Sequence, residues 1–241
     1  MKITNFTYSG PDSDNDMSFD CTAAIENGSD FAVEMVKSSL FILNNEGVCV
    51  GGNHDDEEDT FIDPKDSGTI DLRTGWGGFK GYVFNEEYNK IKILADAILY
   101  RREFTKLGTI DTPKTDDSAS FVTKKTTISG LVDILGVVIS RSKPDDDGDV
   151  RVDVNCGIRN ISNTHIEKAS IKIVLIDQED AQIEDSEEST PIPPHTSKIL
   201  TPNFFRLKTG KLRNSSVRIT ASIYLPVGHA TGEAIAKKEK R

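Results

Sequence analysis

Two acidic segments of the sequence hold carboxylates at the spacing of a metal-binding loop. Three aspartates alternate with other residues in each segment: Asp12, Asp14 and Asp16 in the first, and Asp145, Asp147 and Asp149 in the second. This spacing suits a hard cation such as Ca²⁺, which gathers oxygen ligands at roughly 2.4 Å. An EF-hand loop also needs Gly at its sixth position, where these segments have Met17 and Val150. Because Asp also favours tight turns, we expect two turns without a metal ion, with a metal-dependent site as the alternative.

A third acidic stretch follows a histidine in the first half of the chain. It comprises His54, Asp55, Asp56, Glu57, Glu58 and Asp59. Histidine and carboxylates are ordinary ligands of Zn²⁺ or Mn²⁺, but consecutive residues rarely converge on one ion. We therefore expect a solvated acidic loop that could face a basic partner, rather than a metal centre.

A glycine-rich segment holds the only tryptophan of the chain. Trp76 and Phe79 lie between Gly75 and Gly81. Glycine permits close approach of the backbone, and an exposed aromatic side chain among glycines is suited to anchor a protein partner. In the alternative, Trp76 folds back onto the core, since tryptophan is mostly buried in proteins. We predict that Trp76 and Phe79 contribute to partner binding.

No sequence motif of a known catalytic site occurs in the chain. It has no G-x-S-x-G, H-E-x-x-H, P-loop or C-x-x-C pattern. The remaining histidines, His165, His195 and His229, have no acidic or cysteine companion at ligand spacing. The sequence therefore predicts a protein that is not an enzyme and has no cofactor.

The second acidic segment lies in the later copy of an internal repeat. Residues 142–179 align with residues 9–46 without a gap, at a separation of 133 residues. In both copies apolar residues alternate with polar ones, and a period of two predicts a half-buried strand. The predicted inward residues are Met17, Phe19, Cys21, Ala23 and Ile25 in the first copy, and Val150, Val152, Val154, Cys156 and Ile158 in the second.

The two copies then differ in length. Ile62 aligns with Ile192 at a separation of 130 residues, so the first copy has three more residues, which we expect in the loop with His54. Short strands between turn residues, in units of about a hundred residues, are typical of β-sandwiches. The order of N-x-S, a strand, a turn and I-x-P-x-x-S resembles the immunoglobulin-like sandwiches of bacterial proteins. We predict an all-β fold: a tandem duplication of an immunoglobulin-like antiparallel β-sandwich.

The repeat also suggests domain boundaries. Residues 1–105 would form the first, acidic sandwich, and residues 126–230 the second. Between them, residues 106–125 are polar and rich in turn formers, as in a linker. Residues 231–241 end in A-K-K-E-K-R and are predicted to be a frayed tail.

Charge is distributed unevenly along the chain. Of the net charge of −10, residues 1–118 contribute −12, with 23 acidic and 11 basic side chains. Residues 119–241 contribute +2, with 16 acidic and 18 basic side chains. Because phosphate contacts need clustered Lys and Arg, nucleic acid is not expected as a partner of the first domain.

The cysteines and the hydropathy pattern bear on the compartment. The three cysteines imply no disulfide framework. No apolar run approaches the roughly 20 residues of a membrane span, and the N-terminus lacks the apolar region of a signal peptide. These features predict a cytoplasmic protein that does not insert in membranes.

These observations favour a non-catalytic interaction protein, such as an adaptor, an inhibitor of the immunity type or an assembly component. Its predicted partner is another protein, with a basic surface that faces the first domain. The alternative is a metal-dependent binding protein or hydrolase that uses Ca²⁺, Zn²⁺ or Mn²⁺ at the acidic segments. The sequence does not decide the oligomeric state.

Overall fold

The described residues of the computed structural model, which are 1–9, 13, 16–44, 46–73, 79–80, 90–113, 118–121, 126–212 and 214–237, form an all-β protein with antiparallel sheets. The first strands are β1 (Lys2–Ser9), β2 (Asp16–Glu26), β3 (Val33–Leu43), β4 (Cys49–Ile62), β5 (Ser67–Arg73), β6 (Phe79–Lys80) and β7 (Lys90–Asp111). The later strands are β8 (Ser118–Phe121), β9 (Thr126–Ile128), β10 (Val132–Arg141), β11 (Asp149–Asn160), β12 (Ile166–Ile176), β13 (Gln182–Ile192), β14 (Ser197–Leu200), β15 (Asn203–Lys208) and β16 (Ser216–Lys237). A 3-10 turn, Thr209–Leu212, precedes β16.

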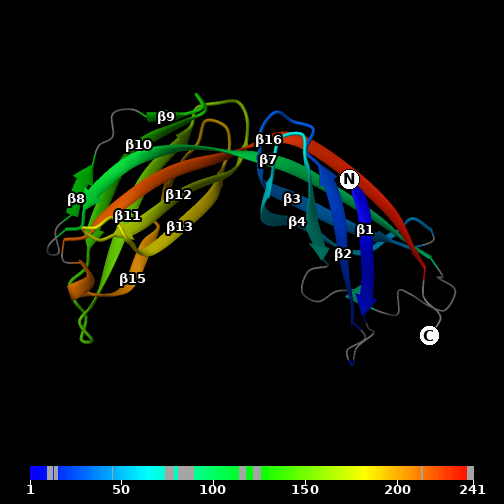
Figure 1. Cartoon of the computed structure of the whole chain (residues 1–241), viewed down its shortest axis with the longest axis horizontal. Coiled ribbons are helices and arrows are strands. Elements are labelled where there is room, and N and C mark those ends of the chain that lie inside the picture. Colours follow the sequence, from blue (N-terminus) through cyan, green and yellow to red (C-terminus); the bar gives the residue numbers. More distant parts are fainter. Residues whose placement is uncertain are drawn as a thin grey trace. The chain divides into compact units, whose positions relative to one another are not determined.

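The chain divides into two compact units, and two long strands belong to both (Figure 1). Unit 1 comprises Met1–Arg101 and Pro226–Arg241, and unit 2 comprises Arg102–Leu225. Strands β7 and β16 have 22 residues each, and each passes from one unit into the other. β7 begins in unit 1 and ends in unit 2, whereas β16 begins in unit 2 and ends in unit 1.

This strand exchange differs from the boundaries predicted from the sequence. Residues 106–111 of the predicted linker are the end of β7, and residues 118–121 form β8. Residues 231–237, predicted to be a tail, continue β16. The reason is that strand pairing is non-local: beyond Pro226 the hydrophobic pattern of β16 is weak, and this part of the strand is ordered by pairing with β7, far away in the sequence.

Unit 1 has two sheets around one core. One sheet has the order β1-β2-β5, with β6 also paired to β2, and the other layer is the β16-β7-β3-β4 part of the six-stranded sheet β13-β12-β16-β7-β3-β4. Alternate residues of β2, β3 and β7 are buried between them. The core comprises Cys21, Ala23, Ile25, Val33, Val36, Leu40, Ile42, Ile62, Ile70, Leu72, Ile93, Ala95, Ala97 and Leu99.

Unit 2 has the corresponding layers. One sheet has the order β14-β11-β10-β8, with β15 paired to β11 and β9 to β10, and the other layer is the β13-β12-β16-β7 part of the six-stranded sheet. Its core includes Val150, Val152, Val154, Cys156, Ile158, Ile171, Ile173, Leu175, Phe204, Ile219 and Ile223.

All five inward positions predicted for β11 are therefore buried, as are Cys21, Ala23 and Ile25 of β2. The side chains of Met17 and Phe19 lie outside the described residues.

Strand register recurs between the units at the separation found in the sequence. Phe6 faces Cys21 in the β1–β2 pair, and Ile139 faces Val154 in the β10–β11 pair. Each pair contains one register shift near its start, next to Ile3 in one case and Ile134 in the other. Beyond these shifts, the two strand pairs therefore have the same backbone register at equivalent sequence positions.

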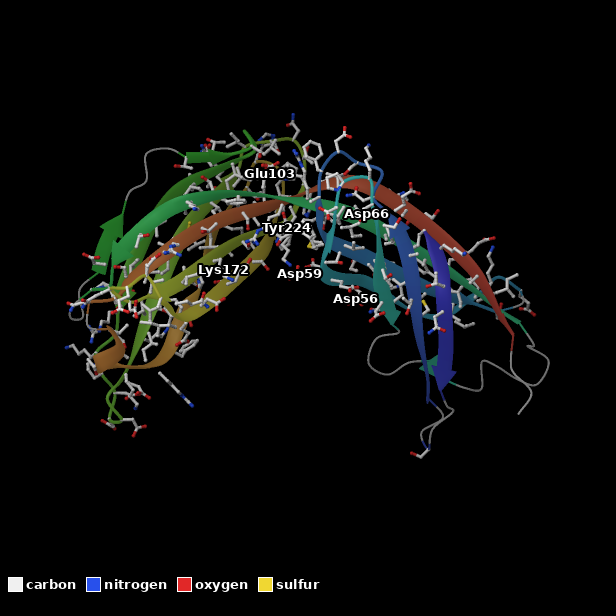
Figure 2. All side chains as sticks on the ribbon, in the orientation of Figure 1. Asp56, Asp59, Asp66, Glu103, Lys172 and Tyr224 are labelled. Carbon is white, nitrogen blue, oxygen red and sulfur yellow. The ribbon has the colours of Figure 1, made fainter. Side chains whose placement is uncertain are left out.

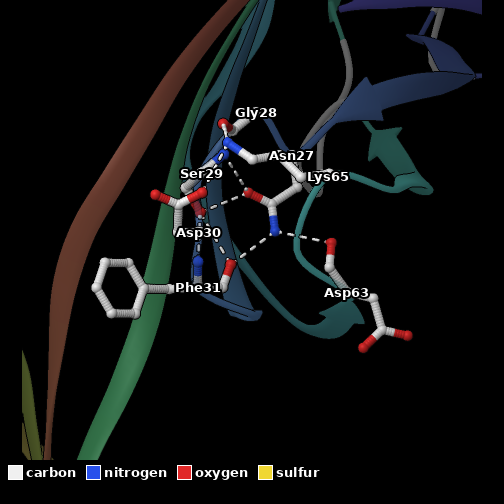
Figure 3. Close-up of polar contacts among 7 residues, drawn as sticks. All are labelled: Asn27, Gly28, Ser29, Asp30, Phe31, Asp63 and Lys65. Atoms are coloured by element: carbon white, nitrogen blue, oxygen red, sulfur yellow. Dashed lines mark hydrogen bonds and ion pairs between the residues drawn. The ribbon is translucent and has the colours of Figure 1, made fainter.

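A buried asparagine organises the turn after the second strand of unit 1 (Figure 3). The Nδ2 of Asn27 donates to the carbonyl oxygens of Phe31 (2.8 Å), Ile62 (3.1 Å) and Asp63 (3.0 Å). Its Oδ1 accepts hydrogen bonds from the backbone N–H (3.1 Å) and the hydroxyl (2.7 Å) of Ser29. Asn27 is 1% exposed, so these bonds replace the water that its amide would otherwise bind.

Four of these five hydrogen bonds recur around Asn160 in unit 2. Its Nδ2 donates to the carbonyl oxygens of Thr164 (2.8 Å) and Ile192 (3.0 Å), and its Oδ1 accepts from both donors of Ser162. In each unit the residue that lies across this turn has a positive φ, 62° at Lys65 and 58° at His195. Both turns are therefore built by the N-x-S motif in the same way.

Burial raises the pKa of the Cys156 thiol on β11 to about 12. Between the ordinary value of 9.0 and this value, the unfolded chain loses the thiol proton while the folded protein keeps it. Stability from this group is therefore complete below pH 9 and is lost as pH rises, by up to about 1.4 kcal/mol per pH unit. Chemical denaturation between pH 9 and 11 should show a shallower decline for Cys156→Ala than for the wild type. Cys49→Ala, at an exposed thiol, is the matched control, and identical slopes for all three proteins would contradict the prediction.

Candidate interaction surface

The acidic residues that the sequence placed in a loop lie on a strand. His54 to Asp59 are part of β4, the terminal strand of its sheet among the described residues. Figure 2 shows Asp56 and Asp59 on this strand. The prediction of a loop is wrong because a terminal strand needs few apolar residues. Val50 and Ile62 contact the core, and the residues between them are exposed or half-buried.

The three additional residues of the first copy are absorbed within β4. The β3–β4 pairing advances ten residues along β3, from Leu43 to Val33, and thirteen along β4, from Cys49 to Ile62. The β12–β13 pairing, by contrast, advances ten residues along each strand, from Ile176 to Ile166 and from Gln182 to Ile192. The difference is taken up by register shifts, and at one of them His54 and Asp55 both lie opposite Ser39. Such bulges bend a strand at the edge of a sheet and redirect its side chains.

Contacts at this bulge hold the start of the acidic run in place. The backbone N–H of Asp55 donates to the Ser39 hydroxyl (3.3 Å), and Asp55 has a φ of 59°. The Asp55 carboxylate lies 3.5 Å from the Lys37 ammonium. The His54 ring contacts the Phe41 ring edge-on, with 4.8 Å between centroids. The His54 side chain is exposed, and its ring packs against Phe41.

The rest of the run alternates between two faces of β4. Glu57 and Asp59 are exposed, whereas Asp56 and Glu58 are half-buried. The Oε2 of Glu58 accepts a hydrogen bond from the backbone N–H of Asp71 on β5 (3.2 Å). Inward carboxylates on a terminal strand also discourage pairing with another strand.

Strand β13 of unit 2 carries a second acidic row that the sequence analysis missed. The row comprises Glu184, Asp185, Glu187 and Glu188, and in the described part of the chain β13 is the other terminal strand of the six-stranded sheet that ends in β4. Asp185 lies 3.1 Å from the Lys172 ammonium, and Glu187 lies 3.8 Å from Arg102. The Oε2 of Glu188 accepts from the Thr201 N–H, as Glu58 does from Asp71. The net charge of this half of the sequence gave no sign of the row, because basic side chains elsewhere in unit 2 offset its negative charge.

The predicted aromatic anchors are not placed by the structure. Trp76 lies outside the described residues, and of Phe79 only the backbone is described, in β6. Their role in partner binding stays a prediction.

The second acidic segment, described in full, forms a hairpin turn. Asp145 Oδ1 accepts hydrogen bonds from the backbone N–H groups of Asp147 (3.0 Å) and Asp149 (2.8 Å). The Asp149 carboxylate pairs with the Lys208 ammonium. Of the first segment, Asp12 and Asp14 lie outside the described residues, and Asp16 is described only as the start of β2. Within the described ranges, no group of three or more His, Cys, Asp or Glu side chains is arranged to hold a metal ion.

One histidine–carboxylate pair emerges only from the fold. His229 on β16 contacts Asp96 on β7 through its Nε2, although the two residues are 133 positions apart. Ser39 lies opposite Asp96 in the β3–β7 register. A catalytic triad needs the histidine between the hydroxyl and the carboxylate. Here the strand order places the carboxylate in the middle, so the row does not provide a base for Ser39.

Comparisons with known proteins add no family. No protein-family model matches the chain, and no curated protein matches its sequence. Among solved structures, the chain is similar to a conserved hypothetical protein from Bacillus anthracis, with 14% identity over 43% of this chain and 91% of that chain and a TM-score of 0.30. It is also similar to a protein from Archaeoglobus fulgidus, with 14% identity over 41% and 81% of the two chains and a TM-score of 0.23. These TM-scores are too low to bear on fold or function.

Proposed function

We propose that this chain is a non-catalytic protein-interaction module that binds a protein with a basic surface through β4 of unit 1. Its two units would be immunoglobulin-like sandwiches derived from one duplicated ancestor. The recurring turns around Asn27 and Asn160, which share four hydrogen bonds at equivalent positions, support the duplication. Function would then have diverged where the copies differ, and the additional residues of β4 are such a difference.

The observation that carries the proposal is the run of carboxylates along a terminal strand. Successive residues of a strand rise about 3.3 Å, so exposed carboxylates at every second residue stand about 7 Å apart. Lys or Arg side chains on an extended partner segment have the same spacing. An acidic row of this kind therefore complements a basic strand, and would accelerate its association over a Debye length of about 8 Å.

Charge in the two units is consistent with this assignment. With the boundaries seen in the structure, unit 1 has 21 acidic and 12 basic side chains, a balance of −9, and unit 2 has 18 and 17, a balance of −1. Unit 1 therefore attracts a basic protein and repels nucleic acid. No helix in the described residues is long and apolar enough to cross a membrane. A cytoplasmic location is part of the proposal.

Exchanging the acidic row of β4 for neutral isosteres should abolish binding, because the attraction is electrostatic. The variant replaces Asp55, Asp56 and Asp59 with Asn, and Glu57 and Glu58 with Gln. The β13 variant, with the same exchange at Glu184, Asp185, Glu187 and Glu188, is the matched control. In capture from a lysate of the producing cells, wild type and the β13 variant should retain a basic protein that the β4 variant loses. Equal capture by all three proteins, or capture that resists 0.5 M salt, would reject β4 as the site.

The boundaries of the units also determine how binding is mapped. Deleting residues 1–105 would remove the start of β7, including Arg102, from unit 2, and would leave the end of β16 without its sheet. Loss of binding on such a deletion would not distinguish the units, whereas the two neutralised variants leave every strand in place.

A further inference from the structure

Strand β1 differs from its counterpart in unit 2 in what lies beside it. β10 is paired with β11 on one side and with β8 and β9 on the other. In the described part of the chain, β1 pairs with β2 alone. Strand β8 pairs with residues Val137–Ser140, which correspond to Thr4–Thr7 at the separation of 133 residues. At these positions β10 of unit 2 has β8 as a second neighbour, whereas β1 has no second neighbour among the described residues.

The other terminal strands of the described sheets carry features that discourage pairing with another strand. Charges, inward carboxylates and short length are the common devices. β4 and β13 carry their acidic rows, β5 includes Asp71 and Arg73, and β8 and β14 have four residues each. β1 has eight residues, without Pro, Gly, Asp or Glu, and Lys2 is its one charged side chain. It is also rich in residues that favour strands, such as Ile3, Thr4 and Tyr8.

We propose that β1 pairs antiparallel with β1 of a second copy of this chain, about a twofold axis. The chain has a net charge of −10, so two copies repel each other over most of their surface. Contact between two β4 or two β13 strands would bring acidic rows together. Contact between two β1 strands brings no carboxylate of either strand into the interface, and a twofold contact uses one surface twice, as most homodimers do.

The packing at the start of β1 limits the pairing to its later residues. A Cβ at Gly232 of β16 would lie 3.1 Å from the carbonyl oxygen of Met1, so β16 closes over the first residue of the chain. Residues Thr4–Ser9 remain for the partner strand. An interface of one strand from each copy is small, so we expect a dissociation constant of about 1–100 µM.

Sedimentation of the full chain across concentration tests the dimer. The apparent mass should rise from 26.5 kDa toward twice that value as concentration passes this range. Asn5→Glu adds a carboxylate to each β1 within the paired segment, so like charges of the two copies repel each other, and it should keep the protein monomeric. Asn155→Glu is the matched control: Asn155 lies on β11, which has neighbours on both sides, so this variant should dimerise as the wild type does. Circular dichroism verifies that both variants fold.

Hydrogen exchange locates the contact. Amides of β1 should exchange at least fivefold more slowly at the dimer concentration than in dilute protein, whereas those of β4 and β13 should not change. A wild type that stays monomeric at several hundred micromolar overturns the proposal. So does a dimer that Asn5→Glu retains, or one in which the amides protected from exchange are those of β4 or β13.

Discussion

Asn27→Ala should lower the free energy of unfolding by about 3–4 kcal/mol, one of the two largest effects we expect. The substitution leaves the carbonyl oxygens of Phe31, Ile62 and Asp63 without the amide that donates to them. It also removes the acceptor of both Ser29 donors. Each buried polar group without a partner costs about 1–3 kcal/mol. Urea denaturation followed by circular dichroism measures the change.

Two further variants separate the network from the turn itself. Asn160→Ala should cost a similar amount, because Asn160 makes the equivalent bonds in unit 2 and is fully buried. Asn44→Ala, in an exposed turn where the side chain accepts from the N–H groups of Glu46 and Val48, should cost about 1 kcal/mol. If Asn27→Ala costs no more than Asn44→Ala, the buried network is not a main source of stability in unit 1.

The parts of the fold that the sequence predicted are those with local signals. The alternation of apolar and polar residues over Val150–Ile158 predicts that every second side chain is buried, and all of them are. This prediction needs no information from the rest of the chain. The N-x-S turns at Asn27 and Asn160 are likewise local, since most of their bonds join residues within four positions. A period of two and a turn motif are therefore sufficient to predict these strands and their ends.

The exchange of strands between the units was not predicted, because its signal is weak. In β16 the residues beyond Pro226 that contact the core of unit 1 are Val227, Ala230 and Ala234. Alanine and glycine at such positions give little alternation, and a proline normally indicates a strand end. What makes this segment a strand is the neighbouring β7, which no local pattern reveals.

The candidate site was predicted in composition but not in structure. Five acidic residues in succession suggest a loop, because a strand is usually recognised from its apolar face. β4 is a strand through its backbone pairing with β3, and its bulges decide which carboxylates are exposed. A shift of one residue in register turns every following side chain to the other face, so the insertion acts on the acidic surface directly.

Gly52 is the residue on which this strand geometry most depends. Its φ is 154°, and a Cβ built on it would lie 2.0 Å from the carbonyl oxygen of Leu40 on β3. Gly52→Ala should therefore lower the free energy of unfolding by about 3 kcal/mol or more, since it adds both backbone strain and a clash with backbone that side-chain rotation cannot relieve. Urea denaturation measures this loss.

Alanine substitutions at two other glycines of unit 1 provide the comparison for the stability loss of Gly52→Ala. Gly47 has a φ of 78° and open space around it, so Gly47→Ala isolates the cost of the left-handed backbone, about 1 kcal/mol. Gly28 has open space and no such φ, so Gly28→Ala should be nearly neutral. The expected order of losses is Gly52, Gly47, Gly28. A Gly52→Ala protein as stable as Gly47→Ala would mean that β4 can leave β3 at this point, and the acidic row would then not be held by the bulge at His54 and Asp55.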